Sequence, residues 1–250
     1  MEDISFRYLS AYALERKESV APYLERRRKG EPLAYILGYV DFLDLRLDVG
    51  PDVLIPRCET EILADKVVGR IKKKGWKSFT VVDLCTGSGC LGLAIKSVFP
   101  EARVILIDIC EKALNIARRN AEKSSLEVEC LLGNLLEEYQ GPFIDLFLCN
   151  PPYVTSQEYE DLELDVKNFE PKKALVGGDN GLEMYQKISK QLFSFMNDGG
   201  LAAFEIGYRQ KDDLEKIYSM DKWSSIECEK DWSGHDRFFF LEKDQKFFYD

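Results

Sequence analysis

The feature that most constrains the fold is an alternation of apolar and helical segments that starts at Glu59 and continues almost to the C-terminus. Apolar runs of strand length are separated by stretches whose apolar residues recur at helical spacing. Strands are expected at 79–84, 103–108, 128–132, 144–149, 200–206, 225–229 and 236–242, and helices at 59–74, 90–98, 111–123, 182–196 and 210–219. Strands that alternate with helices form largely parallel sheets with both faces covered. The pattern predicts an α/β fold with a seven-stranded, mostly parallel sheet and an antiparallel hairpin at its C-terminal edge.

The residues before this region carry a different pattern. Aromatic, leucine and charged residues at helical spacing predict one or two short helices, which end at Gly30-Glu31-Pro32. From Leu33 to Ile55 we expect extended stretches, and the alternation Leu43, Leu45, Leu47, Val49 predicts a strand within a β-hairpin. The expected units are a short N-terminal helical segment (1–32), a β-hairpin linker (33–56) and the alternating α/β domain (57–250).

Composition narrows the compartment and the partners. The chain has 250 residues, and 44 acidic against 34 basic residues give a net charge of -10, which disfavours binding along a phosphate backbone. Its 7 cysteines are scattered without a Cys-x-x-Cys pair, a distribution typical of small core residues in a reducing compartment. No apolar segment is long enough to span a membrane, and no signal peptide is evident. We expect a cytoplasmic monomer that binds no metal, membrane or nucleic acid.

A glycine-rich loop, Asp83-Leu84-Cys85-Thr86-Gly87-Ser88-Gly89, ends one expected strand and opens the next helix. Glycines let the backbone turn tightly and approach a ligand closely. Asp108 ends the following strand, where an acidic side chain can accept hydrogen bonds from ribose hydroxyls. A dinucleotide and S-adenosylmethionine both suit this geometry. An acid at Asp83 would lie poorly beside a pyrophosphate but suits the cationic amino-acid end of S-adenosylmethionine, so the pattern favours the latter.

Asn150-Pro151-Pro152-Tyr153 directly follows the apolar run Ile144–Cys149. Two prolines cannot extend a strand, so the chain must turn there and leave these residues where open α/β sheets bind ligands. The Asn amide offers an acceptor, while the prolines keep their carbonyls without an N–H. The turn thus presents acceptors beside an aromatic ring, a socket that suits a planar NH2 group. Such a socket indicates methyl transfer to an amide or an exocyclic amine, with an ordinary turn as the alternative.

Further motifs occur in order around these two. They are Gly30-Glu31-Pro32-Leu33-Ala34-Tyr35-Ile36-Leu37-Gly38, Leu54-Ile55-Pro56-Arg57-Cys58-Glu59-Thr60-Glu61, Phe169-Glu170-Pro171 and Gly177-Gly178-Asp179-Asn180-Gly181-Leu182. From about Glu25 to the C-terminus, the chain resembles the bacterial peptide chain release factor N5-glutamine methyltransferases. The Asn-Pro-Pro-Tyr turn alone is shared with DNA and RNA amino-methyltransferases, whereas six motifs in this order are much more specific.

The resemblance implies a Rossmann-like class I fold that uses S-adenosylmethionine and releases S-adenosyl-L-homocysteine. The implied substrate is the glutamine of the Gly-Gly-Gln loop of class-1 peptide chain release factors, docked by the N-terminal helices. By position, the cofactor contacts would be Asp83, Cys85, Thr86, Gly87, Ser88, Gly89, Asp108, Asn134, Leu135 and Asn150. Asn150, Pro151 and Tyr153 would be catalytic, and the substrate would be held by Asn150, Pro151, Pro152, Tyr153, Arg57 and Glu170.

The chain departs from the family pattern at several positions. Cys85 replaces a glycine, Cys58 replaces a proline, and Asn134 stands where an acid is often found. Residues 1–32 are shorter than the family's several-helix domain, which predicts a reduced docking surface. The alternatives are a glutamine methyltransferase for a ribosomal protein, an adenine-N6-type nucleic-acid amino-methyltransferase, and a non-catalytic cofactor-binding subunit. Net acidity argues against the nucleic-acid substrate.

A few other positions carry weaker signals. Arg57, Glu59 and Thr60 begin a helix, so helix capping and a place at the mouth of the site both stay open. The only histidine, His235, is expected to be structural or exposed rather than catalytic. Glu205-Ile206-Gly207 ends a strand and is expected to be a simple turn.

Overall fold

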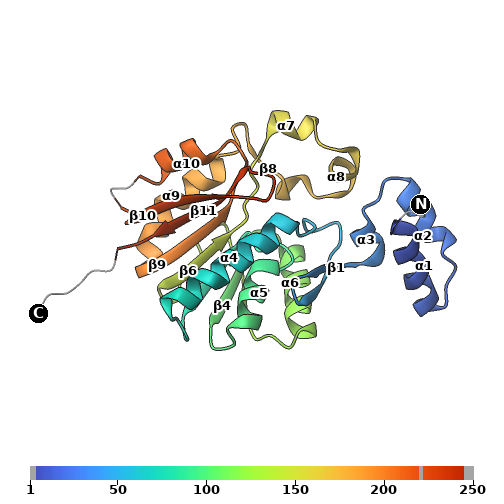
Figure 1. Ribbon diagram of the computed structural model, residues 1–250, viewed down its shortest axis with the longest axis horizontal. Helices are drawn as coiled ribbons and strands as arrows, with labels where there is room; N and C mark the ends of the chain where they lie inside the picture. Colours follow the sequence, from blue (N-terminus) through green and yellow to red (C-terminus); the bar gives the residue numbers. More distant parts are fainter. Residues whose placement is uncertain (1–3, 220–221, 245–250) are drawn as a thin grey trace, which may run out of the picture.

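A seven-stranded sheet with helices on both faces forms the body of the molecule (Figure 1). The structure is a computed structural model that describes residues 4–219 and 222–244. Its strands are β3 (Thr80–Leu84), β4 (Arg103–Asp108), β5 (Glu129–Leu132), β6 (Ile144–Cys149), β9 (Met196–Glu205), β10 (Ser225–Lys230) and β11 (Asp236–Glu242). They lie in the order β10-β11-β9-β6-β3-β4-β5. β11 pairs antiparallel with both β9 and β10, and the remaining pairs are parallel, which confirms the predicted fold class.

Helices cover the two faces of this sheet in separate layers (Figure 1). One layer consists of α4 (Cys58–Lys74), α5 (Cys90–Val98) and α6 (Glu111–Lys123), and the other of α9 (Glu183–Phe195) and α10 (Lys211–Ile217). In α4, Leu63, Val67 and Ile71 recur at helical spacing and are fully buried against the sheet. Every strand and helix expected from Glu59 onward is present, and the largest shift is that β9 begins at Met196 instead of 200.

The N-terminal segment forms its own small cluster, drawn at one end of the molecule in Figure 1. It comprises α1 (Ile4–Arg16), α2 (Ala21–Arg28) and α3 (Leu33–Leu37), packed around Leu9 and Ile36. The expectation of extended chain from Leu33 is wrong for α3. Pro32 starts this single turn, Gly38 ends it with a φ of 80°, and burial of Tyr35, Ile36 and Leu37 stabilises it.

The predicted hairpin is present as β1 (Tyr39–Phe42) paired with β2 (Leu45–Asp48). Leu43 lies in its turn, with a φ of 49° and 46% exposure, and so does not extend the strand as its alternation predicted. A cleft of about 680 Å³ lies between α1, the hairpin and the end of α6. The division into units at 1–32, 33–56 and 57–250 stays a prediction, and α3, which that division places in the linker, packs with α1 and α2.

The segment after β6 forms a small lobe whose short helices and strands the sequence patterns did not indicate. It contains β7 (Val154–Thr155), α7 (Ser156–Glu160), α8 (Leu164–Phe169), a 3-10 turn (Lys172–Ala174) and β8 (Val176–Gly178). Thr155 and Glu158 form a capping box at the start of α7, and β7 pairs with β8. The lobe lies above the carboxyl ends of the parallel strands (Figure 1). Within 4–219 and 222–244, no helix is long and apolar enough to cross a membrane.

Replacing Phe204 by alanine tests the aromatic packing beneath this edge. Phe204 in β9 is fully buried, and its ring centroid lies 5.5 Å from that of Phe147 and 5.4 Å from that of Tyr218. Phe204→Ala should lower the free energy of unfolding by about 3–5 kcal/mol, because it removes buried area and leaves a cavity. Urea titration measures this, with Leu164→Ala, at a side chain 73% exposed, as the control expected to stay within about 0.5 kcal/mol.

Candidate active site

The glycine loop joins β3 to α5 through a series of left-handed backbone conformations. Cys85, Gly87 and Gly89 have φ values of 59°, 54° and 87°. Beneath the loop, the buried Asp83 carboxylate accepts hydrogen bonds from the Thr86 hydroxyl (2.6 Å) and the Gly92 N–H (2.9 Å). Burial raises the pKa of Asp83 to about 7. Asp83 therefore supports the loop from below, and a contact between its side chain and a ligand stays a prediction.

Asp108 lies at the next strand end and binds this loop. One carboxylate oxygen accepts from the Gly87 N–H and the other from the Cys110 N–H, each at 2.9 Å. Burial raises the pKa of Asp108, while these bonds oppose that rise. The segment after β5 adjoins it, since the Gly133 N–H donates to the Asp108 carbonyl (3.1 Å). There Asn134 is exposed and Leu135 is buried with a φ of 60°. Thr86 and Ser88 are also buried.

The Asn-Pro-Pro-Tyr turn stands beside the glycine loop because of strand register. Leu84 pairs with Cys149, and Cys149 pairs with Phe204, so the residues that follow lie next to one another at the sheet edge. The Asn150 side-chain NH2 donates to the Thr60 hydroxyl oxygen at 3.3 Å. Among the described residues, none donates to the Asn150 side-chain oxygen or to the Pro151 carbonyl. The turn thus presents two unoccupied acceptors, as an NH2-binding socket requires.

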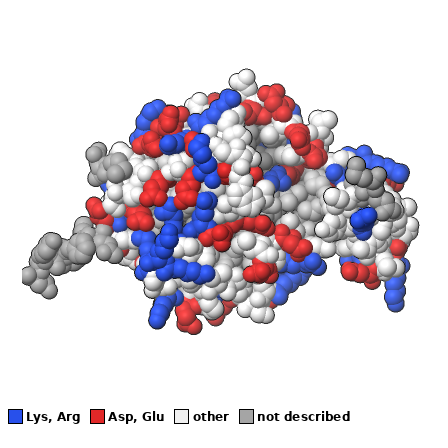
Figure 2. Space-filling view, in the orientation of Figure 1, with Lys and Arg blue, Asp and Glu red and all other residues white. Residues whose placement is uncertain are grey.

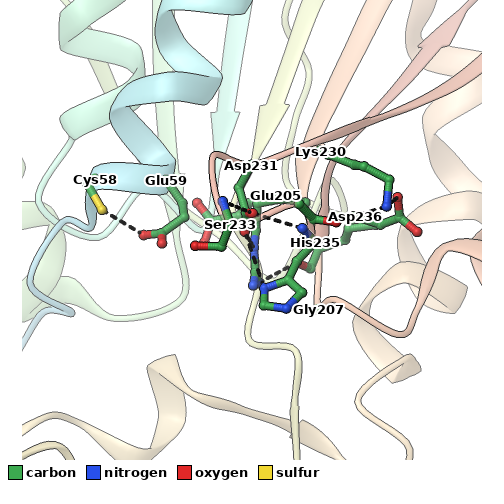
Figure 3. A network of polar contacts seen from close by, with 12 residues as sticks. Cys58, Glu59, Glu205, Gly207, Lys230, Asp231, Ser233, His235 and Asp236 are labelled. Carbon is green, nitrogen blue, oxygen red and sulfur yellow. Dashed lines mark hydrogen bonds and ion pairs between the residues drawn. The ribbon is translucent and has the colours of Figure 1, made fainter.

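Glu205 lies directly behind this turn and is 2% exposed. Its carboxylate accepts hydrogen bonds from the Thr60 hydroxyl (2.6 Å) and the Tyr153 phenol (3.1 Å). Figure 3 shows Glu205 between the first turn of α4, at Cys58 and Glu59, and the loop that joins β10 to β11. The expectation of a simple turn at this position missed its role. The available signal was an acid at the end of an apolar strand, as in Asp83 and Asp108.

The lobe above β6 holds the turn through its backbone. A Cβ atom on Gly177 would come within 2.2 Å of the Pro152 carbonyl oxygen, so only glycine permits this approach. The Gln210 side-chain NH2 donates to the carbonyls of Tyr153 and Gly181, each at 3.0 Å. The position of the turn is therefore fixed by contacts on both sides.

Arg57 and Glu170, predicted to bind substrate, form an ion pair with one another at 2.5 Å. The other Glu170 oxygen accepts from the Ile55 N–H at 3.1 Å. The Glu170 side chain is 1% exposed and that of Arg57 is 34% exposed. Glu170 therefore ties the linker to the lobe, and of the two only Arg57 keeps surface with which to reach a substrate.

His235 lies in the loop between β10 and β11. Its side chain is 55% exposed, which confirms its expected surface position, and its ring packs 5.5 Å from that of Tyr208. The loop is organised by Asp231, whose carboxylate accepts from the backbone N–H groups of Ser233 and His235 (Figure 3).

A parallel sheet with a glycine loop after one strand and an acid at the end of the next suits a nucleotide-containing cofactor, and comparisons with known proteins assign the chain to the class I S-adenosylmethionine-dependent methyltransferases. Residues 44–166 match the family model of the methyltransferase small domain. A methyltransferase from Pyrococcus furiosus has a TM-score of 0.60 at 18% identity, covering 81% of this chain and 90% of that chain. A Thermus thermophilus 16S rRNA N2 G1207 methyltransferase in complex with AdoMet and guanosine has a TM-score of 0.58 at 15% identity. The match covers 82% of this chain and 49% of that chain.

Sequence relatives define the family. The release factor glutamine methyltransferase of Chlamydia trachomatis serovar D is 41% identical over 243 residues, which is 96% of this chain and 83% of that protein. The protein of the same name from Thermodesulfovibrio yellowstonii is 38% identical over 92% of this chain and 82% of its own length. The chain belongs to the release factor glutamine methyltransferase family, and its methyl donor is S-adenosylmethionine.

The residues at the sheet edge fit this cofactor. A Cβ atom built on Gly87 would meet nothing within 4 Å, so open space lies above the glycine loop. The Asp108 carboxylate, at the end of β4, is placed to accept hydrogen bonds from ribose hydroxyls. Residues 85–89, Asp108, Leu135 and Asn150 lie at or after the carboxyl ends of adjacent parallel strands, and their contacts with the cofactor stay a prediction.

Replacing Gly177 by alanine tests the close packing of the lobe on the turn. The added Cβ would force the Pro152 backbone to shift, so Gly177→Ala should lower the methyl-transfer rate by about tenfold or more and cost about 1–3 kcal/mol of unfolding free energy. The matched control is Gly69→Ala in α4, where a Cβ meets nothing within 4 Å. That variant should be as active as the parent and up to about 1 kcal/mol more stable. Equal activity in both would contradict this account of the lobe.

Proposed function

We propose that this protein transfers a methyl group from S-adenosylmethionine to the side-chain amide N5 of the glutamine in the Gly-Gly-Gln loop of class-1 peptide chain release factors. The observation that carries the proposal is the pair of unoccupied acceptors at Asn150 and Pro151, beside Tyr153 and the cofactor loop. Family membership at 35–41% identity supports the same substrate.

The chemical obstacle is the poor nucleophilicity of an amide nitrogen, whose lone pair is delocalised into the carbonyl. When bound, S-adenosylmethionine supplies a methyl group on a sulfonium that is already electrophilic. The Asn150 side-chain oxygen and the Pro151 carbonyl would accept the two amide N–H bonds, which pushes electron density onto the nitrogen and fixes its direction. Orientation of this kind is worth about 7–11 kcal/mol when the geometry is fully fixed. Tyr153 would pack against the amide plane.

Tyr153 is suited to that position because Glu205 restrains it. Burial and the neighbouring Glu205 charge raise the pKa of Tyr153 well above its usual range, so the phenol keeps its proton and donates to Glu205. The ring is thereby held by its hydroxyl end, and the Arg237 guanidinium lies over it, 6.0 Å from the ring centroid. Neither Tyr153 nor the exposed His235 is required as a base before methyl transfer, since the amide proton leaves afterwards.

The N-terminal helices are the proposed docking surface for the release factor. α1 carries three exposed apolar side chains, with Ile4 71%, Tyr8 56% and Leu14 78% exposed. Exposed apolar surface of this kind is typical of a contact with another protein. We further propose that the protein acts as a monomer in the cytoplasm, where release factors function.

A nucleic-acid substrate is disfavoured by the surface charge. Blue and red side chains lie side by side on the face drawn in Figure 2, and along α4 Lys66 pairs with Glu229, while Arg70 pairs with Glu227 and Glu229. Lys74 also pairs with Glu242. Interleaved charges of both signs do not form the continuous basic surface that phosphates require. A glutamine on a ribosomal protein keeps the same chemistry and is the second candidate.

Methyl-labelled S-adenosylmethionine tests the proposal directly. The purified protein should label a bacterial class-1 release factor and should leave its Gln→Ala loop variant unlabelled. Label on both proteins would place the methyl group elsewhere. If neither protein is labelled, although calorimetry shows that the cofactor binds, the proposed substrate is contradicted.

Asn150→Ala should abolish turnover while cofactor binding stays largely intact. The substitution removes one of the two acceptors that orient the amide, so we expect the rate to fall by about a thousandfold or more. Single-turnover labelling measures the rate, and calorimetry with S-adenosylmethionine measures the affinity. Near-normal turnover in this variant would rule out the socket mechanism.

A further inference from the structure

We propose that Glu205 is a positioning residue that acts through Thr60 to hold the Asn150 side chain with its oxygen facing the substrate. This inference rests on the proposed function, because it assumes a primary amide as the group to be methylated. The proposed function names the group that is methylated, whereas this inference concerns the direction of each hydrogen bond behind the Asn150 side chain. The contacts run from Glu205 to the Thr60 hydroxyl (2.6 Å) and from Thr60 to the Asn150 amide (3.3 Å).

The direction of the bonds follows from the number of protons available. An ionised carboxylate can only accept hydrogen bonds, and a hydroxyl has a single proton to donate. Thr60 gives its proton to Glu205, so its oxygen can serve Asn150 only as an acceptor. The group that Asn150 turns toward Thr60 must therefore be its NH2. Its oxygen is left pointing away from Thr60 and is available to accept from a substrate N–H.

The opposite orientation of the Asn150 amide is unfavourable for the same reason. If the amide were rotated by half a turn, its oxygen would face the oxygen of Thr60 with no proton between them. The NH2 group would then be presented to the NH2 of the substrate, and two donors would meet. A carboxylate behind Thr60 thus selects the single orientation that can bind an amide nitrogen.

Three neighbours of Glu205 favour its ionised, accepting form, against the effect of burial. Burial raises the pKa of Glu205, and the Glu59 charge acts in the same direction. The hydroxyls of Thr60 and Tyr153 and the charge of Arg237 oppose that rise. Arg237 is itself held by Asp231 and by the Ile206 carbonyl.

These groups come from separate parts of the chain and are held rigidly. Thr60 lies in the first turn of α4, Asn150 follows β6, and Glu205 ends β9. The Glu205 backbone carbonyl accepts from the buried Tyr185 hydroxyl at 2.7 Å, and Thr60 is 1% exposed. Water therefore has little access to the relay, the chain of hydrogen bonds from Glu205 through Thr60 to Asn150. The hydrogen bonds of the relay are set before substrate binds.

A pair of substitutions at Thr60 separates the hydroxyl from the side-chain volume. Thr60→Val keeps the shape but removes the hydroxyl, so kcat for release factor should fall by about tenfold or more while the affinity for S-adenosylmethionine stays within about twofold. Thr60→Ser keeps the hydroxyl and should retain kcat within about threefold of the parent. A Thr60→Val enzyme with parental kcat would overturn the inference.

A compensating pair at the two ends of the relay tests the direction of its bonds. Asn150→Asp alone should be nearly inactive, because its carboxylate meets a Thr60 oxygen whose proton is committed to Glu205. Adding Glu205→Gln supplies a donor to Thr60, which frees the Thr60 proton for the new aspartate. The double variant should exceed Asn150→Asp by about tenfold or more in kcat. No gain would contradict a directional relay, since simple structural damage at both sites would only accumulate.

A measurement without release factor decides the relay separately from the proposed function. The side-chain NH2 signals of Asn150, assigned by their loss in Asn150→Ala, should exchange slowly with solvent in the parent and in Thr60→Ser. In Thr60→Val their exchange should be faster by about tenfold or more, since the acceptor is gone. If the parent fails to label release factor but shows this protection pattern, the substrate proposal fails and the relay stands. Equal exchange in Thr60→Val and the parent overturns the relay whatever the labelling shows.

Discussion

The in-register pairing of three parallel strands is the constraint on which the rest of the site depends. Leu84 of β3 pairs with Cys149 of β6, which in turn pairs with Phe204 of β9. The next residue on each strand is therefore Cys85, Asn150 or Glu205, and the three stand side by side. The cofactor loop, the amide socket and the buried carboxylate are thus neighbours, although 120 positions separate the first from the last (205 − 85). A shift of register in any one strand would separate them.

Buried carboxylates at this edge cost free energy of desolvation but hold the neighbouring side chains in one arrangement. Asp83 and Glu205 are nearly inaccessible, and burial raises the pKa of each. Each carboxylate accepts hydrogen bonds from two donors. Asp83 accepts from Thr86 and Gly92, and Glu205 accepts from Thr60 and Tyr153. Such satisfied polar groups stabilise one arrangement of their neighbours, because any other arrangement leaves a buried charge unpaired. The cofactor loop and the socket are each organised by one of these acids.

Periodicity and turn residues were enough to predict most of the fold. The bounds of α4, α5 and α6 and of the sheet strands agree closely with the expectations, since long apolar periodic segments allow few alternatives. Short elements such as α3 and the lobe between β7 and β8 were not predicted. Their apolar residues are too few to show a period, and contacts with distant segments, such as that of Gly177 with Pro152, stabilise them.

The sequence by itself determined the α/β architecture, the glycine loop and the acceptors of the Asn-Pro-Pro-Tyr turn, because each depends on local residue chemistry. Only the tertiary structure decided that Glu205 and Thr60 lie behind Asn150, and that Glu170 neutralises Arg57. Those contacts join segments far apart along the chain. Hydrogen bonds of this kind have no local signature, since the partner of a buried acid is set by how strands and helices pack together.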